Sequence, residues 1–171
     1  SVYNFITKHF ISDTLTPIMR VITQFGGTIL MIVWAIASLV LITNKRIAVS
    51  VVSNLVLIAL LNNILKLIVR RARPTGFRLI AETGYSFPSG HSMVSMAFYG
   101  YLIYLIHKNV RNTKLRWILM TGFGILIFII GMSRIYLGVH YTSDVFAGFL
   151  FSLGYLVVYI KMTDPIVFQK K

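Results

Sequence analysis

The chain has 171 residues, of which 57% are hydrophobic and 12% are charged, and its mean hydropathy is +0.79. A soluble domain of this size carries about twice that fraction of charged residues, so we interpret residues 1–171 as a single membrane-embedded helical domain. The net charge of +13 does not indicate a nucleic-acid partner, because the basic residues lie at the ends of apolar runs and not on one polar face.

The first segment, residues 1–20, mixes apolar and aromatic residues with charged ones. This mixture is typical of a helix that lies in the membrane interface. A short soluble cap is the alternative interpretation.

Five apolar runs follow, at residues 21–44, 47–65, 92–106, 117–133 and 145–160. A helix needs about 20 apolar residues to cross a bilayer, with roughly 17 as the lower limit. The third and fifth runs reach this limit only if His91 and Asp144 lie inside their helices. The pattern therefore predicts an all-α, polytopic transmembrane bundle with five spanning helices and with polar groups at membrane depth.

The connections between these runs alternate between the two sides of the membrane. Segments 44–46, 107–116 and 161–171 share one side, and together they hold Lys45, Arg46, Lys108, Arg111, Lys114, Arg116, Lys161, Lys170 and Lys171. By the positive-inside rule this side is cytoplasmic. We therefore expect a multi-pass protein of the cell membrane in which loop 70–90 and the stretch 134–144 meet on the extracytoplasmic side.

The first of three polar stretches on that outer side is KLIVRRARP, at residues 66–74. Lys66 and Arg73 are seven residues apart, so on a helix both point to one side. Pro74 disfavours helical backbone at Arg73, and we expect the helix to end there. Asn62, one turn before Lys66, is expected to line the same cavity. Cationic side chains that extend to the interface from a helix end are the alternative interpretation.

The second stretch is FPSGHS, at residues 87–92. Pro88 and Gly90 indicate a turn, Ser89 is suited to cap a helix, and His91 would lie in the first turn of that helix. Free backbone N–H groups at such a helix start bind anions such as phosphate. An ordinary turn before a helix is the alternative.

The third stretch, SRIYLGVHYTSD at residues 133–144, holds Arg134, His140 and Asp144. If a helix begins near His140, Asp144 lies one turn further on and can accept the proton of one imidazole nitrogen. The other nitrogen then keeps a lone pair and becomes a nucleophile. A purely structural His–Asp pair is the alternative.

Taken together, the three stretches indicate a phosphate site. Lys66, Arg73 and Arg134 would converge with helix-start N–H groups, and guanidinium groups match phosphate oxygens in pairs. Two histidines suit a nucleophile and a general acid. Asp144 is committed to His140, the chain has no cysteine, and a two-metal phosphatase needs several carboxylates. We therefore expect neither a metal nor another cofactor.

These stretches resemble the three signature motifs of the type 2 phosphatidic acid phosphatase family. The matching patterns are Lys-x6-Arg-Pro at 66–74, Pro-Ser-Gly-His at 88–91 and Ser-Arg-x5-His-x3-Asp at 133–144. Every signature position matches, and the motifs come in the family's order. Soluble haloperoxidases share the motifs, but the five apolar runs exclude a soluble relative.

The resemblance implies a catalytic role for each motif residue. His140 would attack the phosphorus atom and form a phosphohistidine, Asp144 would hold His140, and His91 would protonate the leaving alkoxide. Charge on the transferring phosphoryl group would be stabilised by the remaining motif residues: Lys66, Arg73, Arg134, Ser89 and the backbone of Gly90.

The resemblance also bears on substrate and topology. It implies a membrane lipid phosphate as substrate, with phosphatidylglycerophosphate, phosphatidate and undecaprenyl diphosphate as candidates. Membrane members of the family usually have six spanning helices, so the sixth is expected upstream of Ser1. The sequence leaves the oligomeric state open.

A non-catalytic protein that binds or transports anionic lipids is the alternative function. It would need the three cations, but not two histidines and a helix-spaced aspartate. Three further arginines, Arg70, Arg71 and Arg78, suit either a second phosphate or general contact with anionic lipid. Glu82 is a candidate for contact with a polar headgroup.

Overall fold

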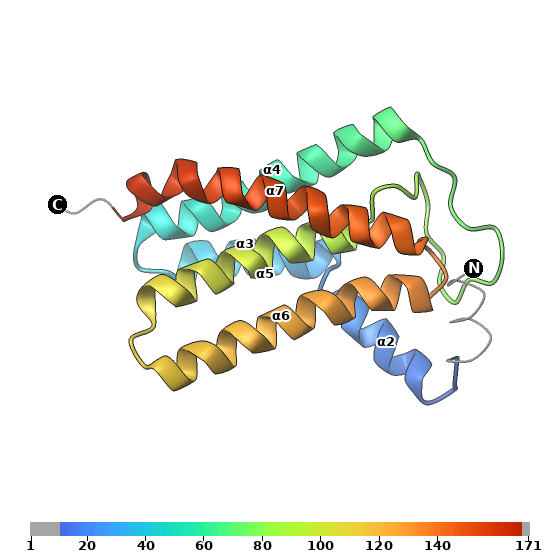
Figure 1. The fold of residues 1–171 in the computed structure, drawn as a ribbon, viewed down its shortest axis with the longest axis horizontal. Coiled ribbons are helices and arrows are strands. Elements are labelled where there is room, and N and C mark those ends of the chain that lie inside the picture. Colours follow the sequence, from blue (N-terminus) through green and yellow to red (C-terminus); the bar gives the residue numbers. More distant parts are fainter. Residues whose placement is uncertain (1–10, 169–171) are drawn as a thin grey trace.

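The computed structural model describes residues 11–168, and all regular elements in this range are α-helices. The six helices are α2 (Leu15–Gln24), α3 (Thr28–Leu41), α4 (Lys45–Val69), α5 (Gly90–Asn109), α6 (Thr113–Tyr136) and α7 (Thr142–Val167). The helices α3 to α7 run roughly along the long axis of the molecule, while α2 is tilted away from it (Figure 1). The prediction of an all-α bundle is confirmed.

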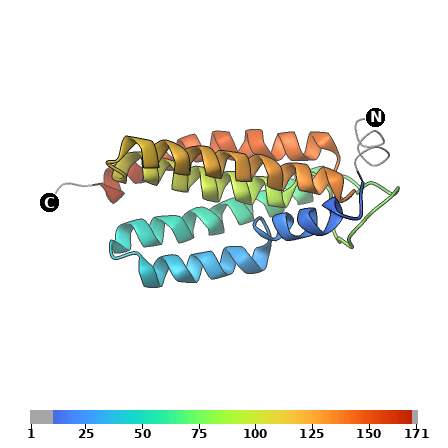
Figure 2. The ribbon, with the colours of Figure 1, turned by 90° about the horizontal axis from the view of Figure 1, so that it is seen from below.

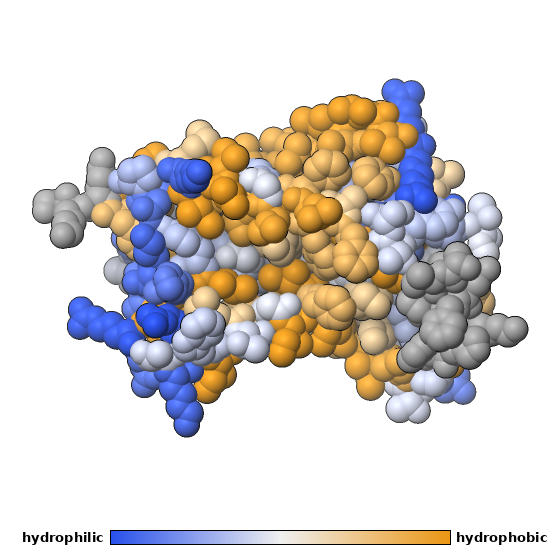
Figure 3. All heavy atoms as spheres, viewed as in Figure 1, coloured by the Kyte–Doolittle hydropathy of each residue, from blue (hydrophilic) through white to orange (hydrophobic). Residues whose placement is uncertain are grey.

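The connections between helices separate into two groups at opposite ends of the bundle. The α3–α4 and α5–α6 connections and the end of α7 lie at one end, while the α4–α5 loop and the α6–α7 turn lie at the other (Figures 1 and 2). In the space-filling view, hydrophilic residues gather at both ends and a broad apolar band lies between them (Figure 3). This arrangement is that of a multi-pass membrane protein.

Three helices, α4, α6 and α7, are each long and apolar enough to cross a bilayer, and α2 with α3 gives a fourth candidate span if the pair is counted together. Many large apolar side chains on these helices are exposed, among them Ile29, Leu67 and Leu150. In water such a surface would cause aggregation, whereas lipid tails solvate it.

The third predicted span corresponds to α5, which is less apolar than the others because it carries serines, tyrosines and histidines. This helix packs against α4, α6 and α7. Its polar groups find partners there: Tyr101 donates to Ser50 Oγ over 2.9 Å, and the Met93 carbonyl accepts from Ser152 Oγ over 2.9 Å. A helix that faces protein on most sides does not need an apolar surface.

The prediction of one continuous helix over residues 21–44 is wrong. The chain breaks between α2 and α3, whose axes differ by 43°. At the break a Cβ on Gly26 would come within 2.8 Å of Ile130 and 3.3 Å of His91, so only glycine allows this close approach. The Phe25 carbonyl, released from the helical pattern, accepts a hydrogen bond of 2.8 Å from Tyr99 Oη. Tertiary contacts thus stabilise a break in an apolar run.

The expected boundary at residue 20 is also absent, because α2 runs without interruption from Leu15 to Gln24 and packs against α6. Arg20 donates to the Leu79 carbonyl over 2.9 Å, so α2 also contacts the α4–α5 loop. Of the predicted interfacial segment, residues 1–10 lie outside the described residues.

The long α4–α5 loop, residues 70–89, folds onto the α6–α7 turn. Gly138 in this turn has a φ of +75°, and a Cβ there would lie 2.1 Å from the Phe77 carbonyl oxygen. Leu79 N donates to the Leu137 carbonyl over 3.0 Å, and Ser89 N donates to the Asp144 carbonyl over 3.1 Å. These backbone contacts bring the first two sequence motifs onto the third.

Candidate active site

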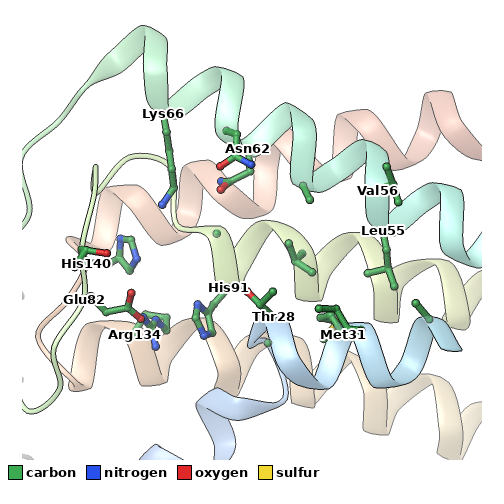
Figure 4. Close-up of a pocket in the computed structure, with 18 of the residues that line it drawn as sticks. Thr28, Met31, Leu55, Val56, Asn62, Lys66, Glu82, His91, Arg134 and His140 are labelled. Atoms are coloured by element: carbon green, nitrogen blue, oxygen red, sulfur yellow. The ribbon is translucent and has the colours of Figure 1, made fainter. Parts of the chain in front are cut away.

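A cavity of about 490 Å³ lies inside the bundle, towards the end that carries the α4–α5 loop. Its polar part is lined by Lys66, Arg73, Glu82, His91, Arg134 and His140. Its apolar part continues between α3 and α4, along Met31, Ile32, Ala35, Val52, Leu55, Val56 and Ala59. Figure 4 shows the labelled polar side chains at one side of the pocket and the labelled apolar ones at the other. The cavity therefore combines a charged head region with an apolar extension.

His140 lies in the α6–α7 turn and is 1% exposed. Arg73 Nη1 lies 3.1 Å from His140 Nε2. Because a guanidinium can only donate, Nε2 is the acceptor and the proton resides on Nδ1. His140 Nδ1 in turn lies 3.5 Å from Asp144 Oδ2. The predicted His–Asp unit is thus present, with the unprotonated nitrogen on the cavity side.

The environment of His140 keeps its ring neutral. Burial lowers the pKa of His140 to about 4, although the hydrogen bond with Asp144 opposes this shift. A neutral imidazole with a free lone pair is the form that acts as a nucleophile.

Asp144, in the first turn of α7, is held by more groups than the sequence indicated. Ser86 Oγ donates to Oδ2 over 2.5 Å, and the Tyr141 backbone N–H donates to the same oxygen over 3.0 Å. Arg71 Nη1 donates to Oδ1 over 2.7 Å and lies over the Tyr141 ring. Ser86 Oγ also lies 3.4 Å from His140 Nδ1. Ser86 and Arg71 are therefore further members of the unit.

Sequence reasoning missed Ser86 altogether and left Arg71 open between a second phosphate and general contact with anionic lipid. The residues themselves are visible, one just before Phe87-Pro88 and the other two positions before Arg73. Nothing in their spacing indicates contact with Asp144, because that contact is made by the folding of the α4–α5 loop onto α7.

The two cations of the first motif reach the cavity by different routes. The helix ends at Val69, four residues before the predicted end, and Arg70 caps it in a left-handed conformation. Arg73 thus lies in the loop and not on the helix face of Lys66, so that prediction is wrong. Arg73 is anchored by the carbonyls of Thr83, Gly84 and Val139, which accept from its guanidinium over 2.9–3.2 Å. Lys66 Nζ donates to the Tyr85 carbonyl over 3.1 Å.

Arg134, near the end of α6, is 1% exposed. Its Nη1 donates to Thr23 Oγ1 over 2.7 Å, and its Nη2 forms a short ion pair with Glu82. Its Nε has no hydrogen-bond partner among residues 11–168. Glu82 also lies 3.8 Å from Arg73 Nη2, which places one carboxylate between two of the three predicted phosphate-binding cations. The sequence did not indicate this contact, since it left Glu82 as a candidate for contact with a polar headgroup.

The start of α5 contributes the second motif. Ser89 is the N-cap and is fully buried; its Oγ accepts from Ser92 N and Ser92 Oγ, and it does not line the cavity. Gly90 and His91 do line it, and so does Asn62, as expected. A Cβ on Gly90 would lie 3.1 Å from Asn62 Oδ1, so glycine permits α5 to begin close to α4. Six of the eight predicted site residues thus line the cavity, Asp144 supports His140 from behind, and Ser89 caps the helix.

The remaining loop cations lie apart from the cavity. Arg78 Nε donates to the Pro74 carbonyl over 2.6 Å, and Arg70 Nε donates to the Leu67 carbonyl over 2.8 Å. In the described part of the chain, no group of three or more His, Cys, Asp or Glu side chains is placed to hold a metal ion. The charge in the cavity is supplied by side-chain cations.

Comparison with known proteins places the chain in a family. The family model of the PAP2 superfamily matches residues 47–167. The chain belongs to the PAP2 superfamily. The matched range includes all three motifs, and the family resemblance inferred from them is confirmed.

Two curated relatives illustrate the range of this superfamily. The PAP2 chain is 38% identical over 105 residues to phosphatidylglycerophosphatase B of Bacillus subtilis, an alignment that covers 59% of this chain and 49% of the relative. It is 28% identical over 161 residues to undecaprenyl-diphosphatase of Sulfolobus acidocaldarius, which covers 90% of this chain and 74% of the relative. The chain thus spans about half the length of the first relative and about three quarters of the second.

A solved structure supports the fold. The crystal structure of a transmembrane PAP2 type phosphatidylglycerolphosphate phosphatase from Bacillus subtilis superposes with a TM-score of 0.84 at 25% sequence identity. The superposition covers 99% of this chain and 88% of the other. The helical arrangement described here is therefore the PAP2 transmembrane fold.

Proposed function

We propose that this PAP2 protein is an integral-membrane lipid phosphatase that hydrolyses a phosphomonoester or diphosphate through a phosphohistidine on His140. The single observation that carries the proposal is the geometry of His140. Its Nδ1 faces Asp144 and Ser86, and its Nε2 faces the cavity. Nε2 lies 3.1 Å from the Arg73 guanidinium, which can donate to a phosphate oxygen instead when substrate is bound. A site built only to bind an anion has no use for an oriented, unprotonated imidazole nitrogen.

In the first half-reaction, His140 Nε2 attacks phosphorus and a P–N bond forms as the P–O bond to the leaving group breaks. His91, at the start of α5, donates a proton to the leaving alkoxide oxygen. Lys66, Arg73 and Arg134 stabilise the charge on the equatorial phosphoryl oxygens, with help from the backbone N–H of Gly90 in the first turn of α5.

In the second half-reaction, a water molecule attacks phosphorus and displaces Nε2. His91, now neutral, takes the proton from this water. Inorganic phosphate and the original state of both histidines result, so the cycle balances. The chemistry needs no metal, because the cations that offset phosphoryl charge are all side chains.

The apolar extension of the cavity supports a substrate with a lipid tail. It follows α3 and α4 from the charged head region into the apolar band of the bundle. An acyl or prenyl chain in this extension keeps the phosphorylated headgroup next to His140 while the tail stays at membrane depth. Phosphatidylglycerophosphate, phosphatidate and undecaprenyl diphosphate are all candidates, since the roles proposed for the site residues involve only the phosphoryl group that these lipids share.

The membrane topology is part of the same proposal. We infer that α5 also spans the bilayer, because it packs against α4, α6 and α7 inside the bundle, which gives five spans with the α2–α3 pair. The end with Lys45, Arg46 and Lys108 then faces the cytoplasm, and the site faces the extracytoplasmic side. A cysteine at Thr83 should react with an impermeant thiol reagent in intact cells, while one at Asn112 should not. The reverse labelling pattern would overturn the orientation.

The test of the function is phosphate release by the purified protein in detergent, from a panel of phosphomonoester and diphosphate lipids. Release from at least one of them should continue in EDTA, and orthovanadate should inhibit it by adopting the shape of the transition state. Complete loss in EDTA with recovery in magnesium would refute the metal-free chemistry. Binding of these lipids without any release would favour a non-catalytic lipid-binding protein.

A further inference from the structure

Glu82 lines the cavity beside two of the cations that the proposed reaction assigns to the phosphoryl group. Its carboxylate forms a short ion pair with Arg134 Nη2 and lies 3.8 Å from Arg73 Nη2. Figure 4 shows it beside Arg134, on the same side of the pocket as His140. Two of the three cations assigned to the phosphoryl group are thus already paired with an internal anion.

The surroundings of Glu82 distinguish it from a purely structural ion-pair partner. Its side chain is 27% exposed, whereas that of Arg134 is 1% exposed. It belongs to the α4–α5 loop and not to a helix. Arg134, in contrast, is fixed by α6 and by its bond to Thr23, and its buried Nε is left without a partner among the described residues. The cation is therefore buried, held on a helix and incompletely satisfied, while the carboxylate lies on a loop and is partly exposed.

We propose that Glu82 is an internal competitor of the phosphoryl group, displaced when substrate binds and returning when inorganic phosphate leaves. The inference rests on the proposed phosphatase function and assigns a new residue to it. A phosphomonoester carries up to two negative charges and three acceptor oxygens, so it can replace one carboxylate on Arg134 and Arg73 with a net gain. Without a competitor, three cations in a buried site would also hold the product phosphate tightly and slow its release.

The proposal predicts the effect of Glu82→Gln, which removes the charge and keeps the shape. The inhibition constant of inorganic phosphate should fall about tenfold or more, since charged hydrogen bonds to Arg are no longer contested. KM for the lipid phosphate should fall as well, while kcat should not rise. An unchanged or higher inhibition constant for phosphate would overturn the proposal.

Two further variants control the measurement. Asp164→Asn removes the same charge from an ion pair with Lys108 at the opposite end of the bundle, so it should leave the inhibition constant of phosphate unchanged. Glu82→Asp keeps the charge on a shorter side chain and should give an intermediate inhibition constant. If Asp164→Asn lowered the constant as much as Glu82→Gln, the effect would come from net charge and the proposal would fail.

Direct binding separates this proposal from the proposed function. Titration of inorganic phosphate into each variant by calorimetry needs no turnover, so tighter binding to Glu82→Gln would support the competitor role even in a protein that released no phosphate. Hydrogen exchange supplies the structural readout. Backbone amides around Glu82 should exchange faster when orthovanadate is bound, because displacement frees this part of the loop. Slower exchange would mean that the loop closes with Glu82 in place, which would refute displacement.

Discussion

Each end of the helix bundle carries an ion pair between a basic side chain and a carboxylate. At the cavity end, Arg134 and Glu82 are 1% and 27% exposed. At the opposite end, Lys108 and Asp164 are 41% and 37% exposed, with their atoms 3.1 Å apart. The same kinds of charge therefore occur in a nearly dry environment and in a wet one.

This difference has functional consequences. Exposed ion pairs contribute little, because water and salt screen them. A buried cation is not screened, so it strongly favours any anion that reaches it. Basic residues in an exposed position are of the kind that the positive-inside rule counts, while a buried cation is suited to hold an anionic group.

The largest expected difference between the two ends concerns their histidines. His140→Ala removes the only atom assigned to accept the phosphoryl group, so turnover and the acid-labile phosphohistidine should both disappear. His107→Ala, at the end of α5 away from the cavity, should retain full activity. Rapid-quench trapping with labelled substrate measures both variants. A trapped intermediate in His140→Ala would show that another residue is the nucleophile.

His91→Ala should slow hydrolysis of a lipid phosphate by about 10²–10⁴-fold, the usual contribution of general acid catalysis. An aryl phosphate with a good leaving group needs little protonation, so on that substrate the variant should lose much less. Comparison of kcat for the two substrates tests the role. Equal losses on both would assign His91 to binding rather than to proton transfer.

Arg134→Lys keeps the positive charge at the cavity end but replaces a fork of donors by a single ammonium group. We expect kcat to fall by about 10²–10³-fold, as when one preorganised donor to a transition state is lost. Arg111→Lys, in the exposed α5–α6 connection at the other end, is the matched control and should change kcat by less than about twofold. Similar losses in both variants would contradict the contrast between buried and exposed cations.

The smallest expected effect is on stability and depends on pH. Burial lowers the pKa of His140 to about 4, whereas an unfolded histidine has a pKa near 6.5. Between these values the unfolded chain binds a proton that the folded chain does not, so the free energy of unfolding decreases as the pH falls. Between pH 6.5 and pH 4, the free energy of unfolding of His140→Gln should therefore decrease by about 3 kcal/mol less than that of the unmodified protein. Thermal unfolding in detergent at several pH values measures the difference, and equal acid sensitivity in both proteins would contradict the burial effect.

Much of the site could be predicted from sequence. The motif spacing identified Lys66, Arg73, His91, Arg134 and His140 as neighbours, and all five line one cavity. Arg73 was predicted to enter the cavity from the same helix face as Lys66. It enters from the loop instead, because α4 ends at Val69 and the loop folds back. The roles of these residues in catalysis remain predictions.

Apolar runs and charged ends determined the helices and the alternation of their connections, since both are properties of neighbouring residues in the chain. Three features were decided by tertiary structure alone: the break at Gly26, the hydrogen bonds from Arg71 and Ser86 to Asp144, and the ion pair of Glu82 with Arg134. Arg71 and Ser86 are 73 and 58 positions from Asp144 in the sequence, and Glu82 is 52 positions from Arg134. Periodicity reports which face a residue takes within its own helix. Which loop carboxylate reaches a buried arginine depends on how the loop folds across the bundle, and no local pattern records that.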